Sequence, residues 1–149
     1  MTNSKLNTTN KKLLIIPCSK TKNKKNNCSA IDLYDGPFFK VIRKHNPKNF
    51  DIIVMSAKYG IIDVNKKISY YDQKMTLDRA KELSTTVSDE LDVILTRSYY
   101  DEVYINLGKI YFEALKPSLN LFKNTKIHMA SGGIGMRLHY LRNWICQDI

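Results

Sequence analysis

Small, hydroxyl-bearing and cationic side chains follow four short apolar runs in this sequence of 149 residues. The loops that carry them are residues 17–22, 56–60, 106–108 and 131–137. Hydroxyl, ammonium and backbone amide groups are the donors that hold a phosphate or stabilise a departing anion. We therefore expect the four loops to build one ligand site if the fold brings them together.

The last of these loops is rich in glycine and precedes a predicted helix. Gly132, Gly133 and Gly135 free the backbone N–H groups to turn toward a ligand, and Arg137 falls in the first turn of the helix. One interpretation is a phosphate cradle formed by these four residues. The other is a tight strand-to-helix turn that needs glycine for close packing. The loop is not a Walker loop, because no Gly-Lys-Ser/Thr follows, and it does not open the first strand–helix unit as a dinucleotide fingerprint would.

Five further side chains are suited to chemistry, and each also has a structural explanation. Cys18 is a candidate nucleophile, or a thiol that lines the site or the core. Lys58 could neutralise a leaving group, or be a solvated lysine in a turn. Asp72 could activate water or stabilise an oxocarbenium ion, or cap a turn or helix. Tyr59 and Tyr71 could stack on a base, or belong to the core.

The elements that would position these side chains alternate between strands and helices. Short apolar runs predict strands at 13–16, 51–56, 102–106 and 126–130. Amphipathic patterns and capping residues predict helices at 38–45, 76–86, 88–98, 109–115 and 136–146. This order predicts one three-layer α/β/α domain over residues 11–149, with a mainly parallel sheet of four strands, after a disordered lead at 1–10. In such sheets ligands bind beyond the carboxyl ends of the strands, where the four loops fall.

The composition excludes several classes of protein. A hydrophobic fraction of 43% and a charged fraction of 26% are ordinary for a globular protein, and they exclude wholesale disorder, collagen-like repeats and a coiled coil. No apolar run reaches the ~18–20 residues of a membrane span, and residues 1–5 lack the apolar stretch of a secretory signal. Three widely spaced cysteines lack the spacing of a metal site. We expect a cytoplasmic protein with no membrane contact, no metal and no cofactor.

The net charge of +10 is unevenly placed. Residues 1–48 hold eleven basic and two acidic residues, whereas residues 49–149 hold thirteen basic and twelve acidic ones. A basic N-terminal third beside the first loop favours a polyanionic partner, which is most often nucleic acid. The alternative is a solubilising surface in a lysine-rich chain.

Four segments, taken in order, resemble a known family. They are Pro-Cys-Ser-x-Thr-Lys at 17–22, Asp-Leu-Tyr-Asp-Gly-Pro-Phe at 32–38, Ser-Ala-Lys-Tyr-Gly at 56–60 and Tyr-Asp at 71–72. They resemble a family of small bacterial, archaeal and phage proteins of unknown function, which is similar in turn to the YaaA proteins and the core domain of archaeosine synthase. The wider group resembles the uracil-DNA glycosylase fold. The resemblance covers residues 12–145 and implies recognition of nucleic acid or a nucleobase, with cleavage of a base–sugar bond.

The sequence also departs from these relatives. It lacks the Lys-Pro-Tyr and His that continue the synthase motif, and Lys22-Asn23-Lys24 stands there instead. It lacks the Gly-Gln-Asp-Pro-Tyr and His-Pro-Ser loops of uracil-DNA glycosylases. Neither lysine-adding chemistry nor uracil as the substrate is therefore expected.

Motif order and charge together lead to the hypothesis of a DNA N-glycosidase, acting on a modified base that is flipped into the pocket. Asp72 would stabilise the sugar cation or orient water, Lys58 and Lys22 would stabilise the departing base, and Ser19 and Ser56 would bond base or phosphate. The expected substrate-binding residues are Cys18, Lys22, Tyr34, Gly36, Tyr59 and Tyr71. DNA is favoured over RNA. The alternatives are a non-catalytic nucleic-acid or nucleotide-binding module on the same fold, and an enzyme that acts on free nucleosides or nucleotides.

Overall fold

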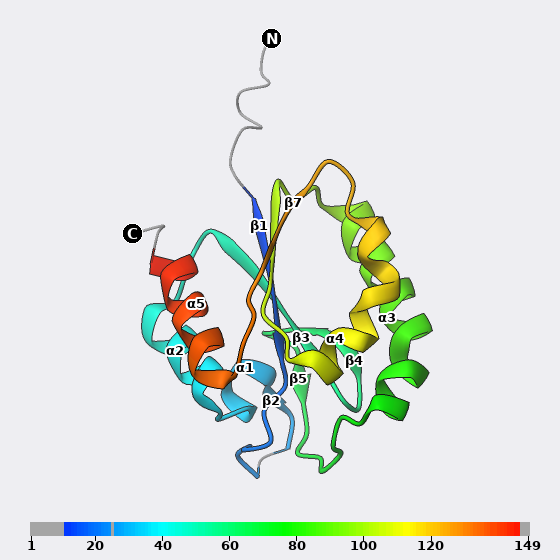
Figure 1. Ribbon diagram of the computed structural model, residues 1–149. Helices are drawn as coiled ribbons and strands as arrows, with labels where there is room; N and C mark the ends of the chain where they lie inside the picture. The colour runs from blue at the N-terminus through cyan, green and yellow to red at the C-terminus, as the bar shows by residue number, and fades with distance from the viewer. Residues whose placement is uncertain (1–10, 25, 147–149) are drawn as a thin grey trace.

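The computed structural model describes residues 11–24 and 26–146, so the predicted disordered lead at 1–10 lies outside the described residues. Its centre is a five-stranded sheet in the order β4-β3-β1-β6-β7 (Figure 1). The strands are β1 (Lys12–Pro17), β3 (Phe50–Ser56), β4 (Gly60–Asp63), β6 (Glu102–Ile105) and β7 (Lys126–Met129). β1, β3, β6 and β7 are parallel, and β4 pairs antiparallel with β3 at one edge. The four predicted strands are therefore confirmed, whereas the prediction of a four-stranded sheet is wrong.

The middle strand shows why its sequence is a continuous apolar run. All four residues from Leu13 to Ile16 are fully buried. Leu14 and Ile16 belong to the core on one face of the sheet, and Leu13 and Ile15 belong to the core on the other. A parallel strand that is covered on both faces has no polar side, so its sequence does not alternate between apolar and polar residues. Only the short length of the apolar run then indicates a strand.

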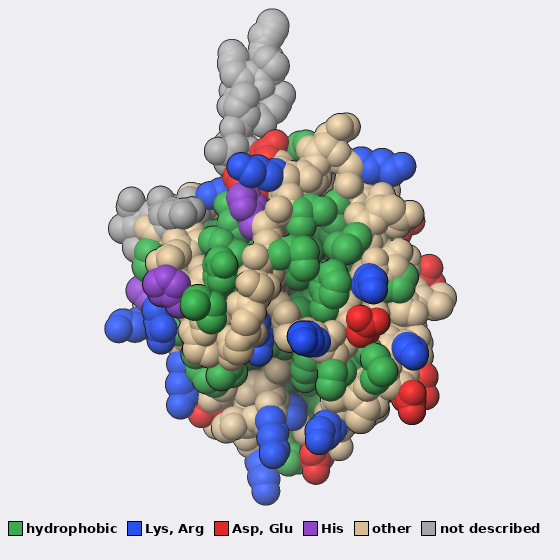
Figure 2. All heavy atoms as spheres, in the orientation of Figure 1, with side chains coloured by type: hydrophobic (Ala, Val, Ile, Leu, Met, Phe, Trp, Pro, Cys, Tyr) green, Lys and Arg blue, Asp and Glu red, His purple; other side chains and the backbone are tan. Residues whose placement is uncertain are grey.

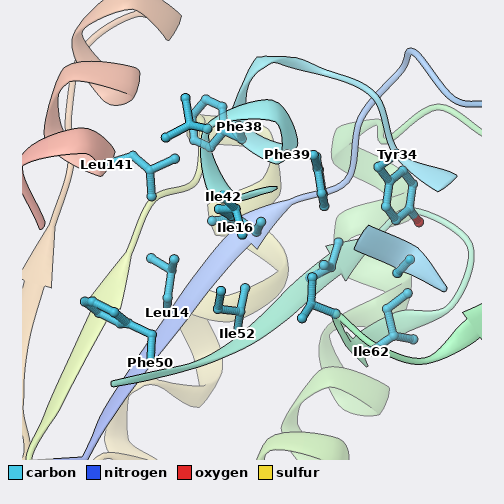
Figure 3. Packing of buried hydrophobic residues seen from close by; sticks show 14 of the residues in the cluster. Leu14, Ile16, Tyr34, Phe38, Phe39, Ile42, Phe50, Ile52, Ile62 and Leu141 are labelled. Atoms are coloured by element: carbon cyan, nitrogen blue, oxygen red, sulfur yellow. The ribbon is translucent and has the colours of Figure 1, made fainter. Parts of the chain in front are cut away.

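Helices cover both faces of the sheet and make three layers (Figure 1). One layer contains α1 (Ala30–Leu33), α2 (Pro37–His45) and α5 (Ile134–Cys146). The other contains α3 (Leu77–Arg97), α4 (Lys109–Leu115) and a 3₁₀ helix at Lys116–Leu121. Figure 3 shows the first core, in which α2 and α5 contribute residues such as Phe38, Ile42 and Leu141 that pack over Leu14 and Ile16 of β1.

Three local predictions need correction. β4 is not among the predicted strands, and neither is the short antiparallel pair β2 (Cys28–Ser29) and β5 (Lys67–Ile68). The two helices predicted at 76–86 and 88–98 form the single helix α3. Thr76 does cap that helix, since its hydroxyl accepts a hydrogen bond from the Arg79 backbone N–H at 3.1 Å. The helix continues past the cap-like Ser88-Asp89-Glu90 because Val87 and Leu91 are fully buried one turn apart and anchor it to the sheet.

None of the helices in the described part of the chain combines the length and apolarity needed to cross a membrane. Likewise, no group of three or more His, Cys, Asp or Glu side chains among residues 11–24 and 26–146 is arranged to hold a metal ion.

Candidate functional site

The carboxyl ends of β1, β3 and β6 lie at one end of the sheet, where the residues that follow β1 and β6 border two clefts. The arginine cleft, of about 280 Å³, is lined by the polar residues Ser19, Lys20, Thr21 and Arg137 and by Pro17, Cys18, Gly36, Pro37, Phe38, Phe39, Gly108, Tyr111 and Ile134. The aspartate cleft, of about 350 Å³, is lined by Cys18, Ser19, Lys20, Lys22, Asp72, Gln73, Lys74, Met75 and Tyr111. The predicted convergence of the strand-end loops is therefore observed for the loops after β1 and β6 and for Arg137.

A shared wall separates the two clefts. Cys18, Ser19, Lys20 and Tyr111 line both of them. The Cys18 Sγ and the Tyr111 hydroxyl lie 3.2 Å apart, and burial together with the neighbouring Cys18 raises the pKa of Tyr111 well above its ordinary value. Tyr111 therefore stays protonated and offers an O–H group at the wall. Cys18 is half-buried there, which fits the site-lining interpretation of this thiol.

Asp72 supplies the only carboxylate among the residues that line either cleft in the described part of the chain. It lies in the extended segment between β5 and α3, and its side chain is exposed. Within the described residues, no hydrogen bond or ion pair engages this carboxylate. Lys20, Lys22 and Lys74 line the same cleft. The cleft thus combines a carboxylate that has no hydrogen-bond or ion-pair partner among the described residues with three lysine ammonium groups. This arrangement suits a reaction in which positive and negative charge separate.

Ser56 lies behind the cleft rather than in it. The residue is fully buried, and its Oγ lies 2.9 Å from the Tyr71 hydroxyl. The same Oγ accepts hydrogen bonds from the backbone N–H groups of Lys58 and Tyr59, at 3.2 Å and 3.0 Å. Ser56 is therefore not positioned to contact a substrate directly, because its buried hydroxyl holds the turn after β3.

Tyr34 and Tyr71 form a buried hydrogen-bonded pair under the cleft, with their hydroxyls 2.6 Å apart. Burial raises the pKa of both hydroxyls well above the ordinary value, so both remain neutral. The Lys22 Nζ lies 4.5 Å from the centre of the Tyr71 ring. The two tyrosines are core residues that support Lys22, not surfaces on which a base could stack directly.

Lys58 is exposed in the turn after β3 and lines neither cleft. Its Nζ lies 5.2 Å and 5.8 Å from the ring centres of Tyr59 and Tyr71. Arg79 fixes the turn by donating hydrogen bonds to the carbonyl oxygens of Ala57 and Lys58. The structure therefore brings Lys58 near the Tyr59 and Tyr71 rings but does not place it among the residues that line the aspartate cleft.

Gly36 and Ser19 are linked by packing. A Cβ atom at position 36 would collide with the Ser19 side chain, so the absence of a side chain at Gly36 makes room for that hydroxyl-bearing residue. Gly36 also precedes Pro37 at the first turn of α2, where proline is favourable. The role that the structure gives Gly36 is to position Ser19 at the wall between the clefts.

The glycine loop does not build a cradle around either cleft. Residues 131–136 are exposed, and neither Gly132, Gly133 nor Gly135 lines a cleft. Gly132 has φ +91°, a left-handed conformation that favours glycine, whereas a Cβ at Gly133 or Gly135 would meet open space. Close packing therefore explains none of these positions except Gly132. Of the four predicted phosphate-binding residues, only Arg137 lines a cleft.

We expect Gly135→Ala to stabilise the protein by about 0.4–1 kcal/mol, because the position is helical and open and alanine restricts the unfolded chain. Gly132→Ala is the matched comparison and should destabilise by about 1–2 kcal/mol, given its left-handed φ and the nearby Met136 Cβ. Urea denaturation measures both. A Gly135→Ala protein that is less stable than the wild type would contradict the conclusion that a side chain at position 135 meets open space.

Sequence reasoning missed Tyr111, Lys20 and Lys74. Tyr111 could have been found, because it lies on α4, one helical turn after Gly108, and Gly108 belongs to a loop that the topology rule had selected. Lys74 comes from outside the basic N-terminal third, and no sequence signal distinguishes it from other exposed lysines.

The N-terminal positive charge is also less concentrated at the site than predicted. Lys11 and Lys12 lie at the amino end of β1, at the opposite end of the sheet, where Lys11 pairs with Asp51 at 3.9 Å. The site itself receives Lys20, Lys22 and Lys74. Figure 2 shows Lys and Arg side chains at the lower end of the molecule, where the loops beyond the carboxyl ends of β1 and β3 lie in Figure 1.

Comparisons with known proteins identify the family but no activity. A search of functionally curated proteins finds no significant match. The crystal structure of AF0587, a protein of unknown function, is similar in fold, with a TM-score of 0.56 at 11% sequence identity. The match covers 90% of this chain and 44% of that one, so this chain spans less than half the length of its structural neighbour. The model of a family of unknown function, DUF6884, matches residues 13–143, and the chain therefore belongs to that family.

Proposed function

We propose that this protein is an N-glycosidase that hydrolyses the bond between a base and deoxyribose in DNA. The observation that carries the proposal is the uncommitted Asp72 carboxylate in a cleft with Lys20, Lys22 and Lys74. Cleavage of an N-glycosidic bond creates positive charge on the sugar and negative charge on the base, and this cleft offers an opposite charge to each. We also propose the uracil-DNA glycosylase-like form of the α/β/α fold. A mostly parallel sheet with helices on both of its faces supports this proposal.

The reaction would proceed in the aspartate cleft with a flipped nucleotide. The C1′–N bond breaks, its electron pair leaves with the base, and the sugar becomes an oxocarbenium ion that Asp72 stabilises. A water molecule adds to C1′, and Asp72 takes the proton that the water releases. The base leaves as an anion beside Lys22 or Lys20 and takes a proton from solvent, and Asp72 returns its proton to solvent, so that no proton is gained or lost overall. The products are the free base and an abasic sugar, so one water is consumed for each bond broken.

The other predicted residues support this cleft from outside it. Tyr71 and Tyr34 hold the floor beneath Lys22, and Ser56 fixes the turn that carries Lys58. Lys58 then adds positive charge near Tyr71 without touching the base. DNA would approach over Lys20, Lys22 and Lys74, giving affinity that falls steeply with salt.

A second candidate is a nucleic-acid or nucleotide-binding module without catalysis. The observation that favours it is the burial of Ser56, which removes one of the predicted catalytic groups from the cleft. The two candidates differ in products, because a binding module releases no base.

The test is to incubate the full chain with modified and unmodified DNAs, and to measure free bases by mass spectrometry and abasic sites by alkaline strand cleavage. The glycosidase predicts both products in equal amounts from at least one modified DNA. Salt-sensitive binding with no base and no abasic site from any DNA would overturn the glycosidase and support the binding module.

A further inference from the structure

Arg137 differs from the other half-buried arginines because its side chain has no hydrogen-bond or ion-pair partner among the described residues. Arg43 donates to the Asp35 carboxylate at 2.7 Å and to two backbone carbonyls. Arg79 donates to two carbonyls and pairs with Glu82. By contrast, the Arg137 side chain makes no hydrogen bond or ion pair with any described residue, and its Nε is buried without a partner.

The surroundings of Arg137 strengthen its attraction for an anion. The guanidinium lies over the Phe38 ring, with its carbon 5.5 Å from the ring centre, and burial lowers the pKa of Arg137. A desolvated cation without a counter-ion is costly in a folded protein unless something else supplies the charge. An anion that enters the arginine cleft would supply it, and the apolar floor would keep water from screening the pair.

The cleft is also shaped to receive a small oxyanion. Ser19 and Thr21 bring hydroxyl groups and Lys20 brings an ammonium group to the same cleft. Gly108 lies beside the guanidinium, since a Cβ there would be in ordinary van der Waals contact with Arg137 Nη2, at 3.5 Å. The buried Asn106 side chain donates a hydrogen bond to the Arg137 carbonyl at 2.9 Å and fixes the first turn of α5. A forked guanidinium with hydroxyl donors nearby is the usual recognition set for a phosphate.

We infer that the arginine cleft is a phosphate subsite, so that the substrate is a phosphorylated nucleoside unit rather than a free nucleoside. This inference rests on the proposed function, because it places the nucleoside in the aspartate cleft next door. The two clefts share the wall of Cys18, Ser19, Lys20 and Tyr111, so a sugar in one cleft and its phosphate in the other are neighbours, as they are in a nucleotide. The phosphate contact is made by the Arg137 side chain, not by the exposed glycines ahead of it.

The experiment is a titration of the full chain with pyrophosphate, followed through backbone amide NMR shifts. It is repeated with a 5′-deoxynucleotide, the same deoxynucleoside without phosphate, and a dinucleotide, all at constant ionic strength. We expect saturable shifts at Ser19, Thr21, Gly108 and the first turn of α5. We also expect the nucleotide to bind about tenfold or more tightly than the nucleoside, the effect of one charge-assisted contact. The dinucleotide distinguishes a terminal phosphate from one within a chain.

Arg137→Gln should erase the preference for the nucleotide, and Arg137→Lys should retain only part of it because the fork is lost. Arg142→Gln, an exposed arginine on the same helix, is the control that should keep the preference. Equal wild-type affinity for nucleotide and nucleoside would overturn the inference. So would pyrophosphate shifts confined to exposed lysines, or a preference that survives Arg137→Gln. If Arg137→Gln fails to fold, the wild-type shift map and Arg137→Lys decide.

The outcomes also separate this inference from the proposed function. Pyrophosphate binding at Arg137 without any base release would leave the phosphate subsite in place and overturn the glycosidase. Base release from a nucleoside at the same rate as from its nucleotide would leave the glycosidase in place and overturn the subsite.

Discussion

Asp72→Asn is expected to slow base release by about 10²–10⁴-fold, the range for removing a positioned general base or a charge that stabilises the transition state. The amide keeps the size and exposure of the side chain but can neither balance a sugar cation nor take a proton from water. Because Asp72 is exposed and uncommitted among the described residues, the change should leave stability within about 0.5 kcal/mol of the wild type. Single-turnover base release and urea denaturation measure the two quantities.

The control for Asp72→Asn is Asp89→Asn, the same chemical change at an exposed position on α3. Asp89→Asn should leave base release unchanged. DNA binding by Asp72→Asn should be as tight as that of the wild type or tighter, since a negative charge leaves a basic cleft. A rate that is unaltered in Asp72→Asn, with binding intact, would show that this carboxylate takes no part in the chemistry.

The fold was predictable where burial leaves a simple signal. The apolar runs at 13–16 and 52–55 indicated central strands because all of their residues are buried in the two cores. The edge strand β4 was missed because it is short and because its first residue, Gly60, is of a type that is common in turns. In the structure this glycine has φ +80°. The prediction of two helices that meet near Ser88 was wrong for a different reason. The burial of Val87 and Leu91 stabilises a continuous helix more than local capping preferences stabilise a break.

The site was predictable to the level of loops but not of side-chain direction. The topology rule brings Cys18, Ser19 and Arg137 to one end of the sheet, and they do line a cleft there. Sequence does not state whether a side chain at a strand end points toward solvent or into the interior. Ser56 points inward to the Tyr71 hydroxyl, and the three glycines of the loop at 131–137 are exposed and line neither cleft. Residues with suitable chemistry therefore occupy structural or exposed positions.

The stability of the cleft floor depends on Tyr71, and we expect Tyr71→Ala to destabilise the protein by about 3–5 kcal/mol, the usual cost of truncating a buried aromatic. Tyr71→Phe should cost about 1–3 kcal/mol, because the buried hydroxyls of Tyr34 and Ser56 lose a hydrogen-bond partner while the ring stays in place. Urea denaturation of both variants gives the comparison.

A double-mutant cycle shows whether the hydroxyl pair is the cause. Tyr34→Phe with Tyr71→Phe removes both partners of the 2.6 Å contact and should cost less than the sum of the single changes, by about 0.5–3 kcal/mol. Additive costs would mean that the two hydroxyls are not coupled. Because phenylalanine keeps the ring beneath Lys22, Tyr71→Phe should retain base release at temperatures where it is folded. A folded Tyr71→Phe protein that releases no base would instead place this hydroxyl in the reaction itself.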